Sequence, residues 1–330
     1  MSRFLADQNQ VTFKFESGTY AVVSGGEHWI GAVQSNDVDD EMGVLSIRYA
    51  GTATRNVDQY VDGPQDVTGT LTYFPQDWKF LHFALGSNVD GGSPSPYTHT
   101  ISETNTDNGN AFTSGTLNPF VSFTVVDSQS KGTAGENFVR TVNGCVVDSL
   151  TMTAAQGEII NMEVGFRGQS SNYSSGAIAA ITDTATTRPF LWSDVEVHKP
   201  SGTVLPTVKE VSVTVNNNFE APHYLNGSRV VSTPFPQSRD YEISLTVDST
   251  SEKTKEFYDQ NLIGGSEFNM IFAVNASTGS RAMAWTFSGC KLMDMESPSE
   301  VEGVNEQTLT IAAKTSVVLV DDAIELYNPW

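Results

Sequence analysis

Histidines, cysteines and clustered carboxylates are the residues of this 330-residue chain that could carry chemistry, and their spacing points to no enzyme. No two histidines have metal-ligand spacing or lie four positions apart, as two ligands on one helix face would. Gly-x-Ser-x-Gly, Gly-x-Gly-x-x-Gly, Walker and Cys-x-x-Cys motifs do not occur. The five histidines are His28, His82, His99, His198 and His223. The sequence therefore predicts no catalytic residue, no cofactor and no metal site.

The acidic residues form one conspicuous cluster, Asp-Val-Asp-Asp-Glu at positions 37–41. It resembles a calcium-binding loop only loosely, because the glycine and the closing glutamate are not at the required spacing. We interpret the cluster as a solvated turn. The two carboxylates of a glycosidase are set by their separation in space, so the sequence alone indicates no such pair.

The two cysteines stand in similar stretches of sequence, 145 positions apart (290 − 145). Cys145 and Cys290 each follow a glycine, and the residues around each predict a β-hairpin whose return strand alternates apolar and polar side chains. The return strands are expected at about 159–166 and 307–313. We interpret both cysteines as small buried apolar residues of separate cores rather than as a disulfide, redox or metal pair.

The order of predicted elements also occurs twice: strand, long loop, strand, helix, two strands and the hairpin with the cysteine. The first strands are expected at 45–49 and 211–215, the strands before the helices at 67–73 and 241–247, and the helices at 75–86 and 252–262. This repetition predicts an all-β chain with minor α, made of two tandem β-sandwich or barrel domains, each with one flanking helix. The expected domains are 1–185, with an N-terminal arm, an insertion at about 87–118 and a linker at about 169–187, and 186–330, with a C-terminal tail.

The composition bounds the partners and the location. Thirty-nine acidic and 18 basic residues give a net charge of −21, which argues against a basic surface that grips nucleic acid. An acidic halophilic surface and a surface that must not adhere to DNA both explain this charge, and we favour the first. The start of the sequence has no signal-peptide pattern and no run is long enough to span a membrane, so we expect a protein made and kept in the cytoplasm.

Strands with one apolar and one polar face leave open edges, which are an aggregation hazard unless assembly uses them. Edges that pair around a closed ring remove the hazard and produce a wide barrel with a polar bore.

The order of elements resembles that of the tail tube proteins of long-tailed bacterial and archaeal viruses. The resemblance depends on two-faced strands around a long loop with glycine and proline (224–236), a strand that leads into a single helix, the closing Gly-Cys hairpin, and the segment 188–195 that opens the second unit. In that family six tube domains form a ring whose inner strands build a barrel, a long loop contacts the next ring, and DNA passes through the bore. Two fused domains then imply a trimeric ring with pseudo-sixfold symmetry.

The resemblance implies two sets of site residues, each of which could instead belong to an ordinary solvent-facing surface. The candidates for the bore lining are Ser46, Arg48, Thr68, Thr70, Thr72, Ser212, Thr214, Glu242, Ser244 and Thr246. The candidates for contacts between rings are Gly51, Arg55, Gly63, Pro64, Tyr224, Gly227, Arg229 and Pro236.

The implied partners are other copies of the chain and other tail proteins, such as a tape measure, a terminator and a baseplate or tail tip. Viral DNA passes without specific binding, no membrane is involved, and the protein belongs to a virion tail assembled in the host cytoplasm. Two alternatives stay open: a cell-surface or secreted β-sandwich adhesin, and a carbohydrate-active enzyme.

Overall fold

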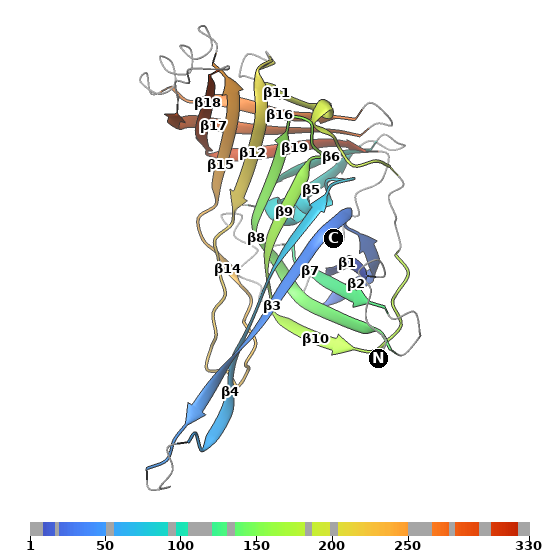
Figure 1. Cartoon of the computed structure of the whole chain (residues 1–330), viewed down its shortest axis with the longest axis vertical. Helices are drawn as coiled ribbons and strands as arrows, with labels where there is room; N and C mark the ends of the chain where they lie inside the picture. The colour runs from blue at the N-terminus through green and yellow to red at the C-terminus, as the bar shows by residue number, and fades with distance from the viewer. Residues whose placement is uncertain are drawn as a thin grey trace.

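The computed structural model describes residues 9–16, 20–50, 56–91, 97–104, 121–130, 136–181, 187–198, 204–249, 266–276, 281–296 and 305–322 (Figure 1). Within these ranges the chain is almost entirely β-structure, with α1 (Lys79–Leu85) as its α-helix and η3 (Trp192–Asp194) as a short 3-10 turn. The described part contains no helical segment that could cross a lipid bilayer.

The central layer is an antiparallel sheet of eight strands, to which both halves of the chain contribute four. We call it the eight-stranded sheet. Its order is β3 (Ala32–Ile47), β4 (Gln59–Phe74), β9 (Asn161–Gly168), β8 (Phe138–Ala155), β12 (Val208–Asn216), β15 (Asp240–Asp248), β18 (Glu306–Ala313) and β17 (Ala282–Glu296).

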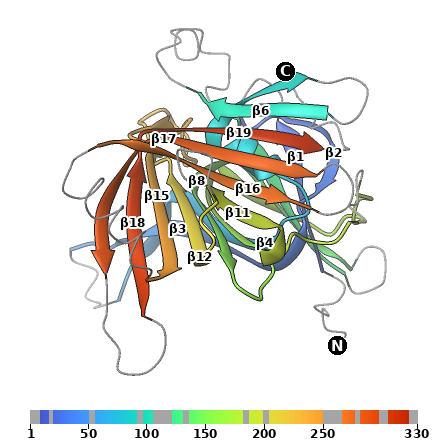
Figure 2. The ribbon, with the colours of Figure 1, turned by 90° about the horizontal axis from the view of Figure 1, so that it is seen from above.

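Two further sheets cover this layer, and the long strands β8 and β17 pass from the eight-stranded sheet into them. The first has the order β2 (Val23–Trp29), β1 (Asn9–Glu16), β7 (Phe123–Gln129), β8 and β10 (Ser170–Ser174). The second has the order β11 (Val195–His198), β16 (Phe268–Asn275), β17, β19 (Thr315–Asp322), β6 (Tyr97–Glu103) and β5 (Gly86–Gly91). A short pair, β13 (Phe219–Glu220) and β14 (Phe235–Pro236), stands apart. Seen from above, the strands of the second covering sheet cross those of the eight-stranded sheet (Figure 2).

The core fills the space between the layers because every second side chain of the central strands is apolar. On β12, for example, Val211, Val213 and Val215 are buried while the residues between them face the other side. One large cluster of buried residues contains both Cys145 and Cys290, so the expected separate cores are wrong; Val146 and Phe219 form a second, small cluster. Direct pairing of β8 with β12 carries the apolar face from one half into the other.

The helix α1 confirms the prediction for residues 75–86, although it is shorter. It ends where Gly86 adopts φ 102°, a left-handed conformation that suits glycine. All of its residues are buried, and the ring of Phe80 contacts those of Phe13, Tyr73 and Phe123. The helix therefore fills the space between the sheets. The second helix, expected at 252–262, lies outside the described residues.

Several sequence expectations need correction. The acidic cluster 37–41 is not a turn but the middle of β3, where Asp37 and Asp39 lie opposite Thr70 and Thr68 on the polar face. Acidic residues at alternate positions are compatible with a strand as long as the face on which they lie is solvated. The loop expected between the strands at 45–49 and 67–73 is shorter, because β4 begins at residue 59. The N-terminal arm is β1, paired on both sides, and the expected linker contains β10. Within the expected insertion, β5 and β6 extend the second covering sheet through β19.

Three irregularities of strand pairing in the first half recur in the second. Cys145 and Cys290 lie opposite Phe123 and Phe268 next to a register shift, and Gly144 and Gly289 before them have φ values of 66° and 64°. The second shift lies at Val147–Ser149, where β8 pairs with β9, and recurs at Leu292–Asp294, where β17 pairs with β18. The third lies at Val33–Ser35, where β3 pairs with β4, and recurs at Val208–Glu210, where β12 pairs with β15. The shifts at residues 33 and 208 are 175 positions apart, whereas the strands expected at 45–49 and 211–215 are 166 apart (211 − 45).

Candidate assembly surfaces

The first candidate surface is the polar face of the eight-stranded sheet. Direct strand pairing places one row of side chains across five neighbouring strands, in the order Thr72, Glu163, Thr151, Thr214 and Glu242. The sheet brings most of the predicted bore residues onto this face: Thr68, Thr70, Thr72, Ser212, Thr214, Glu242, Ser244 and Thr246. The two halves therefore present a single polar surface.

Ser46 and Arg48 lie elsewhere. Ser46 is opposite Tyr60, beyond a register shift between Met42 and Val44, and Arg48 follows the end of β3. Both belong to the far part of the β3–β4 hairpin, which projects from the sheet (Figure 1).

Sequence reasoning missed the polar residues that the Gly-Cys hairpins add to this face. They are Ser149, Thr151 and Thr153 of β8, Asn161 and Glu163 of β9, and Thr308 and Thr310 of β18. The sequence pattern could have identified these residues, because the alternation that predicted the apolar sides of these hairpins also defines their polar sides.

The charges on this face are mainly acidic. Two of its basic side chains are neutralised locally: Arg167 binds Asp148 at 3.0 Å, and Lys209 binds Asp248 and Glu306, each at 2.6 Å. Hydrogen bonds to these two carboxylates raise the pKa of Lys209. A third, Lys291, lies in the row of Glu242, next to Ala312. Acidic residues in register on the face include Asp37, Asp39, Glu163, Glu210, Glu242 and Asp294. Such a surface repels phosphate groups and offers no basic stripe.

The second candidate surface consists of the two edges of the eight-stranded sheet. Across the internal joint between β8 and β12, the hydroxyls of Thr151 and Thr214 are 3.1 Å apart. In the described part of the chain, no strand pairs with the outer side of β3 or of residues 291–296 of β17. Apolar side chains are exposed to solvent near these edges: Met42 is 47% exposed and Met293 is 61% exposed. The eight-stranded sheet therefore ends on both sides in a strand whose outer edge can pair with another strand.

The third candidate surface is the projection formed by the far part of the β3–β4 hairpin together with residues 221–236, which we call the arm (Figure 1). Arg229 Nη1 donates to Asp62 Oδ2 at 2.9 Å, and the Arg229 carbonyl accepts from the Gln65 amide at 2.9 Å. His223 Nε2 lies 3.0 Å from Asp66 Oδ1. The arm is therefore built from both halves of the chain.

The arm gathers the predicted inter-ring residues Gly63, Pro64, Tyr224, Gly227 and Arg229, and it ends at Pro236, which lies in β14 opposite Phe219. Gly51 and Arg55 lie outside the described residues. Large apolar side chains on the arm are exposed: Val44, Leu45, Tyr60, Tyr224 and Leu225.

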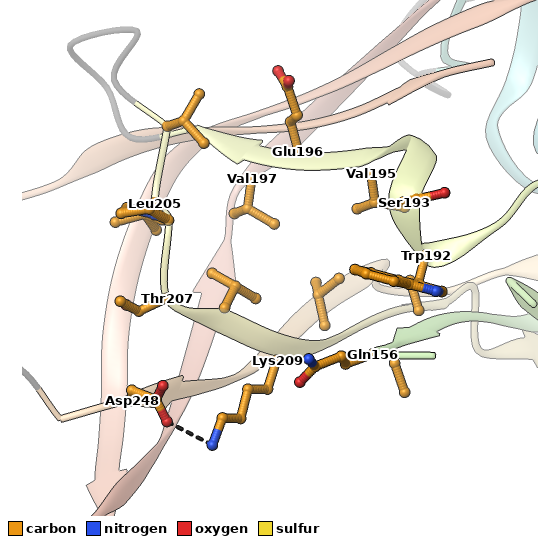
Figure 3. Close-up of a pocket in the computed structure, with 16 residues that line it drawn as sticks. Gln156, Trp192, Ser193, Val195, Glu196, Val197, Leu205, Thr207, Lys209 and Asp248 are labelled. Atoms are coloured by element: carbon orange, nitrogen blue, oxygen red, sulfur yellow. Dashed lines mark ion pairs between the residues drawn. The ribbon is translucent and has the colours of Figure 1, made fainter. Parts of the chain in front are cut away.

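A groove of about 450 Å³ lies at the end of the molecule opposite the arm, beside β11 and the start of β12 (Figures 1 and 3). Trp192, Val195, Val197 and Leu205 supply much of its wall. Among its charged residues, Lys209 is held by Asp248, as the dashed line in Figure 3 shows, and Glu196 Oε2 lies 3.1 Å from His198 Nε2. The groove thus combines apolar side chains with polar and charged ones, which suits contact with another protein surface.

The two cysteine thiols and the imidazole of His82 are buried. Burial raises the pKa of the Cys290 thiol to about 11 and that of Cys145 well above its ordinary value, so both stay protonated. Burial lowers the pKa of His82 to about 4. Among the described residues, no three His, Cys, Asp or Glu side chains lie close enough to hold a metal ion.

Comparison with known proteins identifies the family. Residues 47–313 match the family model described as phage tail tube protein. This chain belongs to the phage tail tube protein family. The resemblance predicted from the sequence and the all-β class with minor α are thereby confirmed, and the tail tube protein is a structural component of a viral tail. The family is a class of structural proteins rather than of enzymes.

Several solved structures are similar to parts of the tail tube protein. The tube-terminating cap of the anti-feeding prophage is 18% identical over 42% of this chain and 97% of its own, with a TM-score of 0.33. The SPP1 tail tube is 13% identical over 42% of this chain and 82% of its own, with a TM-score of 0.32. A chain from the virion of a native gene transfer agent is 13% identical over 38% of this chain and 94% of its own, with a TM-score of 0.29. A comparison with curated proteins gives no match.

Proposed function

We propose that three copies of this tail tube protein close into a ring with pseudo-sixfold symmetry, and that stacked rings form the tube through which viral DNA is delivered. The observation that carries the proposal is the eight-stranded sheet itself. Two four-stranded units are joined edge to edge at β8 and β12, and each outer edge is open. A joint of the same kind between chains, repeated around an axis, closes the sheet into a barrel.

The recurring pairing irregularities support a duplicated tube domain. The register shifts at Val147 and Leu292, and those at Val33 and Val208, occupy the same places in units with the same strand order. A β-bulge is a specific local feature, and coincidence at three places is best explained by repetition of one unit. Two such units in each of three chains give six around the ring, with 24 strands in the barrel (3 × 8).

The size of this barrel suits a channel. Strands spaced about 4.8 Å apart and tilted by about 40° give 24 strands a backbone-to-backbone diameter of roughly 45–50 Å. The polar face of the eight-stranded sheet must then face inward, because the opposite face is the packed core. Threonine, serine and carboxylate side chains carry no positive charge, so the polar face has few groups that could bind the phosphates of passing DNA.

The ends of the molecule suit the stacking of rings. The arm projects at one end and the groove beside Trp192 lies at the other, so stacking brings arms and grooves together (Figures 1 and 3). Exposed apolar residues of the arm match the apolar wall of the groove. The end rings of such a tube are left to bind other tail proteins, namely a tape measure, a terminator and a baseplate or tail tip. Assembly then takes place in the host cytoplasm.

The test is electron microscopy of the purified protein at molar salt, combined with native mass measurement. We expect rings or tubes with a central opening and three chains in each ring. Monomers at every salt concentration, or closed rings with another number of chains, would contradict the proposal.

A further inference from the structure

We propose that β17 of one chain pairs with β3 of the next in the register that β8 and β12 use within a chain, and that the carboxylates brought together there make ring closure depend on cations. This inference rests on the proposed ring and specifies its joint. The pairing of β8 with β12 serves as the template for this joint. The described residues include these two strands and also the edge strands, β17 and β3, that we propose to pair in the same way.

The matching register shifts fix the register. The shift at Val147–Ser149 recurs at Leu292–Asp294, so β17 follows β8 with an offset of 145. The shift at Val33–Ser35 recurs at Val208–Glu210, so β12 follows β3 with an offset of 175. No further shift interrupts β3 before Met42. These offsets can therefore be carried along both edge strands.

The internal pairs then predict the pairs between chains. Thr151 opposite Thr214 becomes Glu296 opposite Asp39 of the neighbouring chain. Ser149 opposite Asn216 becomes Asp294 opposite Glu41 of the neighbouring chain.

The two joints differ in charge. Hydroxyls meet across the internal joint, where Thr153 and Ser212 approach to 3.5 Å in addition to the pair described above. The joint between chains instead collects four carboxylates on its polar face. β3 contains no basic residue, and residues 291–296 of β17 contain Lys291 alone. In the described structure Asp39, Glu41, Asp294 and Glu296 make no ion pair that would neutralise them.

Apolar side chains at the two edges favour closure. Met42 and Met293 are exposed at the two edges in the single chain and come to the joint when strands pair. By the same offsets Met295 faces Asp40 of the neighbouring chain, a carboxylate that already accepts a hydrogen bond from Gln65 at 2.8 Å and lies 3.8 Å from Arg140. Apolar contact and backbone pairing thus favour closure, and the carboxylates on the polar face oppose it.

Salt decides between these effects. Side chains directly opposite each other across antiparallel strands have Cβ atoms about 5 Å apart. The Debye length is about 10 Å at 0.1 M salt and about 3 Å at 1 M, so repulsion at this separation persists at the lower concentration and is screened at the higher. The chain should stay monomeric at low salt and close into rings as salt is raised.

The register is tested by disulfide cross-linking of assembled protein. The double variant Asp39→Cys/Glu296→Cys places two thiols directly opposite each other, at a Cα separation of about 4.5–5.5 Å that a disulfide can bridge. Within one chain these positions lie at opposite edges of the sheet, roughly 34 Å apart over seven strand spacings, so a bond between them must join two chains. The matched control is Asp37→Cys/Glu296→Cys, displaced by two residues on the same face.

We expect covalent dimers and trimers on non-reducing gels for the first variant and mainly monomers for the control. Efficient cross-linking of the control instead, or of neither variant in protein that forms rings, would overturn the register while leaving the ring intact. If the wild-type protein forms no rings in any salt, the proposed function itself fails, so the two failures can be told apart.

The charge effect is tested with Asp294→Asn/Glu296→Gln, against Glu136→Gln/Glu158→Gln as a control that removes the same formal charge away from both edges. Light scattering as a function of sodium chloride concentration gives the midpoint of ring formation. We expect the edge variant to lower that midpoint several-fold and the control to leave it close to wild type. Equal midpoints for the edge variant and the wild type would refute the role of these carboxylates.

Discussion

Replacement of His82 by phenylalanine should make the fold more resistant to acid. His82 lies in α1 between the sheets and is 5% exposed. Burial lowers its pKa to about 4, and the nearby Asp90 and the backbone of Ser87 oppose the shift only in part. Below pH 6.5 the unfolded chain therefore binds a proton at this position that the folded chain binds only near pH 4. The stability that the neutral imidazole contributes is complete above pH 6.5 and is lost as the pH falls toward 4.

The size of the loss follows from the two pKa values. A difference between 6.5 and about 4 corresponds to a loss of about 2 kcal/mol between pH 7.5 and pH 5, and of about 3 kcal/mol by pH 4. Phenylalanine has a similar shape and no proton to bind, so this part of the acid sensitivity should disappear. Other carboxylates add their own pH dependence, which both proteins share.

The assay is urea unfolding of the monomer at low salt, followed by the fluorescence of the buried Trp78 and Trp285 at pH 7.5 and pH 5. The quantity compared is the change in unfolding free energy between the two pH values. His82→Phe should reduce that change by about 2 kcal/mol. Phe80→Leu, which disturbs the same helix without a titrating group, should lower stability equally at both. A change for His82→Phe as large as in the wild type would show that the histidine is not buried as described.

Three further substitutions test other parts of the structure. A Cβ at Gly63 would lie 1.9 Å from the carbonyl oxygen of Gly43, so Gly63→Ala should distort the arm and stop tube growth at single rings in electron micrographs, whereas Gly176→Ala should not. Glu16 is fully buried and accepts four hydrogen bonds, so Glu16→Ala should cost about 3 kcal/mol of unfolding free energy measured in urea; a loss below 1 kcal/mol would contradict this assignment. Thr70→Lys should make assembled tubes bind duplex DNA with an affinity that falls steeply with salt, whereas Thr70→Gln should not bind it, as fluorescence anisotropy can show.

The sequence was informative wherever local pattern decides the structure. Alternation on β12 and β15 predicted which residues face the polar side, and Gly86 predicted the end of α1. The same rules failed for β3, where consecutive carboxylates suggested a turn although the strand continues through them. A strand whose exposed face is acidic and a turn rich in acidic residues look alike until the pairing partner, here β4, is known.

Contacts between distant segments were beyond the sequence. Nothing local indicates that Arg229 reaches Asp62, or that β6 pairs with β19, because these contacts depend on how the two halves meet. The similar positions of the register shifts in the two halves could not be predicted from the sequence for the same reason. The register shifts at residues 33 and 208 have no fixed sequence signature, whereas the glycine before each cysteine marks the shift beside it directly.

Fusion of two units in one chain explains why the two kinds of joint can differ. The joint between β8 and β12 forms within a chain, so it pays no translational entropy of association and can be neutral and permanent. The joint that we propose between β17 and β3 forms only when rings assemble, and on this proposal the carboxylates on both edge strands keep free chains from adding to one another beforehand. Exposed apolar residues at Met42 and Met293 then favour closure once cations screen the charge. An arrangement with acidic edges and a neutral internal joint thus protects the open strands of a monomer while it preserves their ability to close a ring.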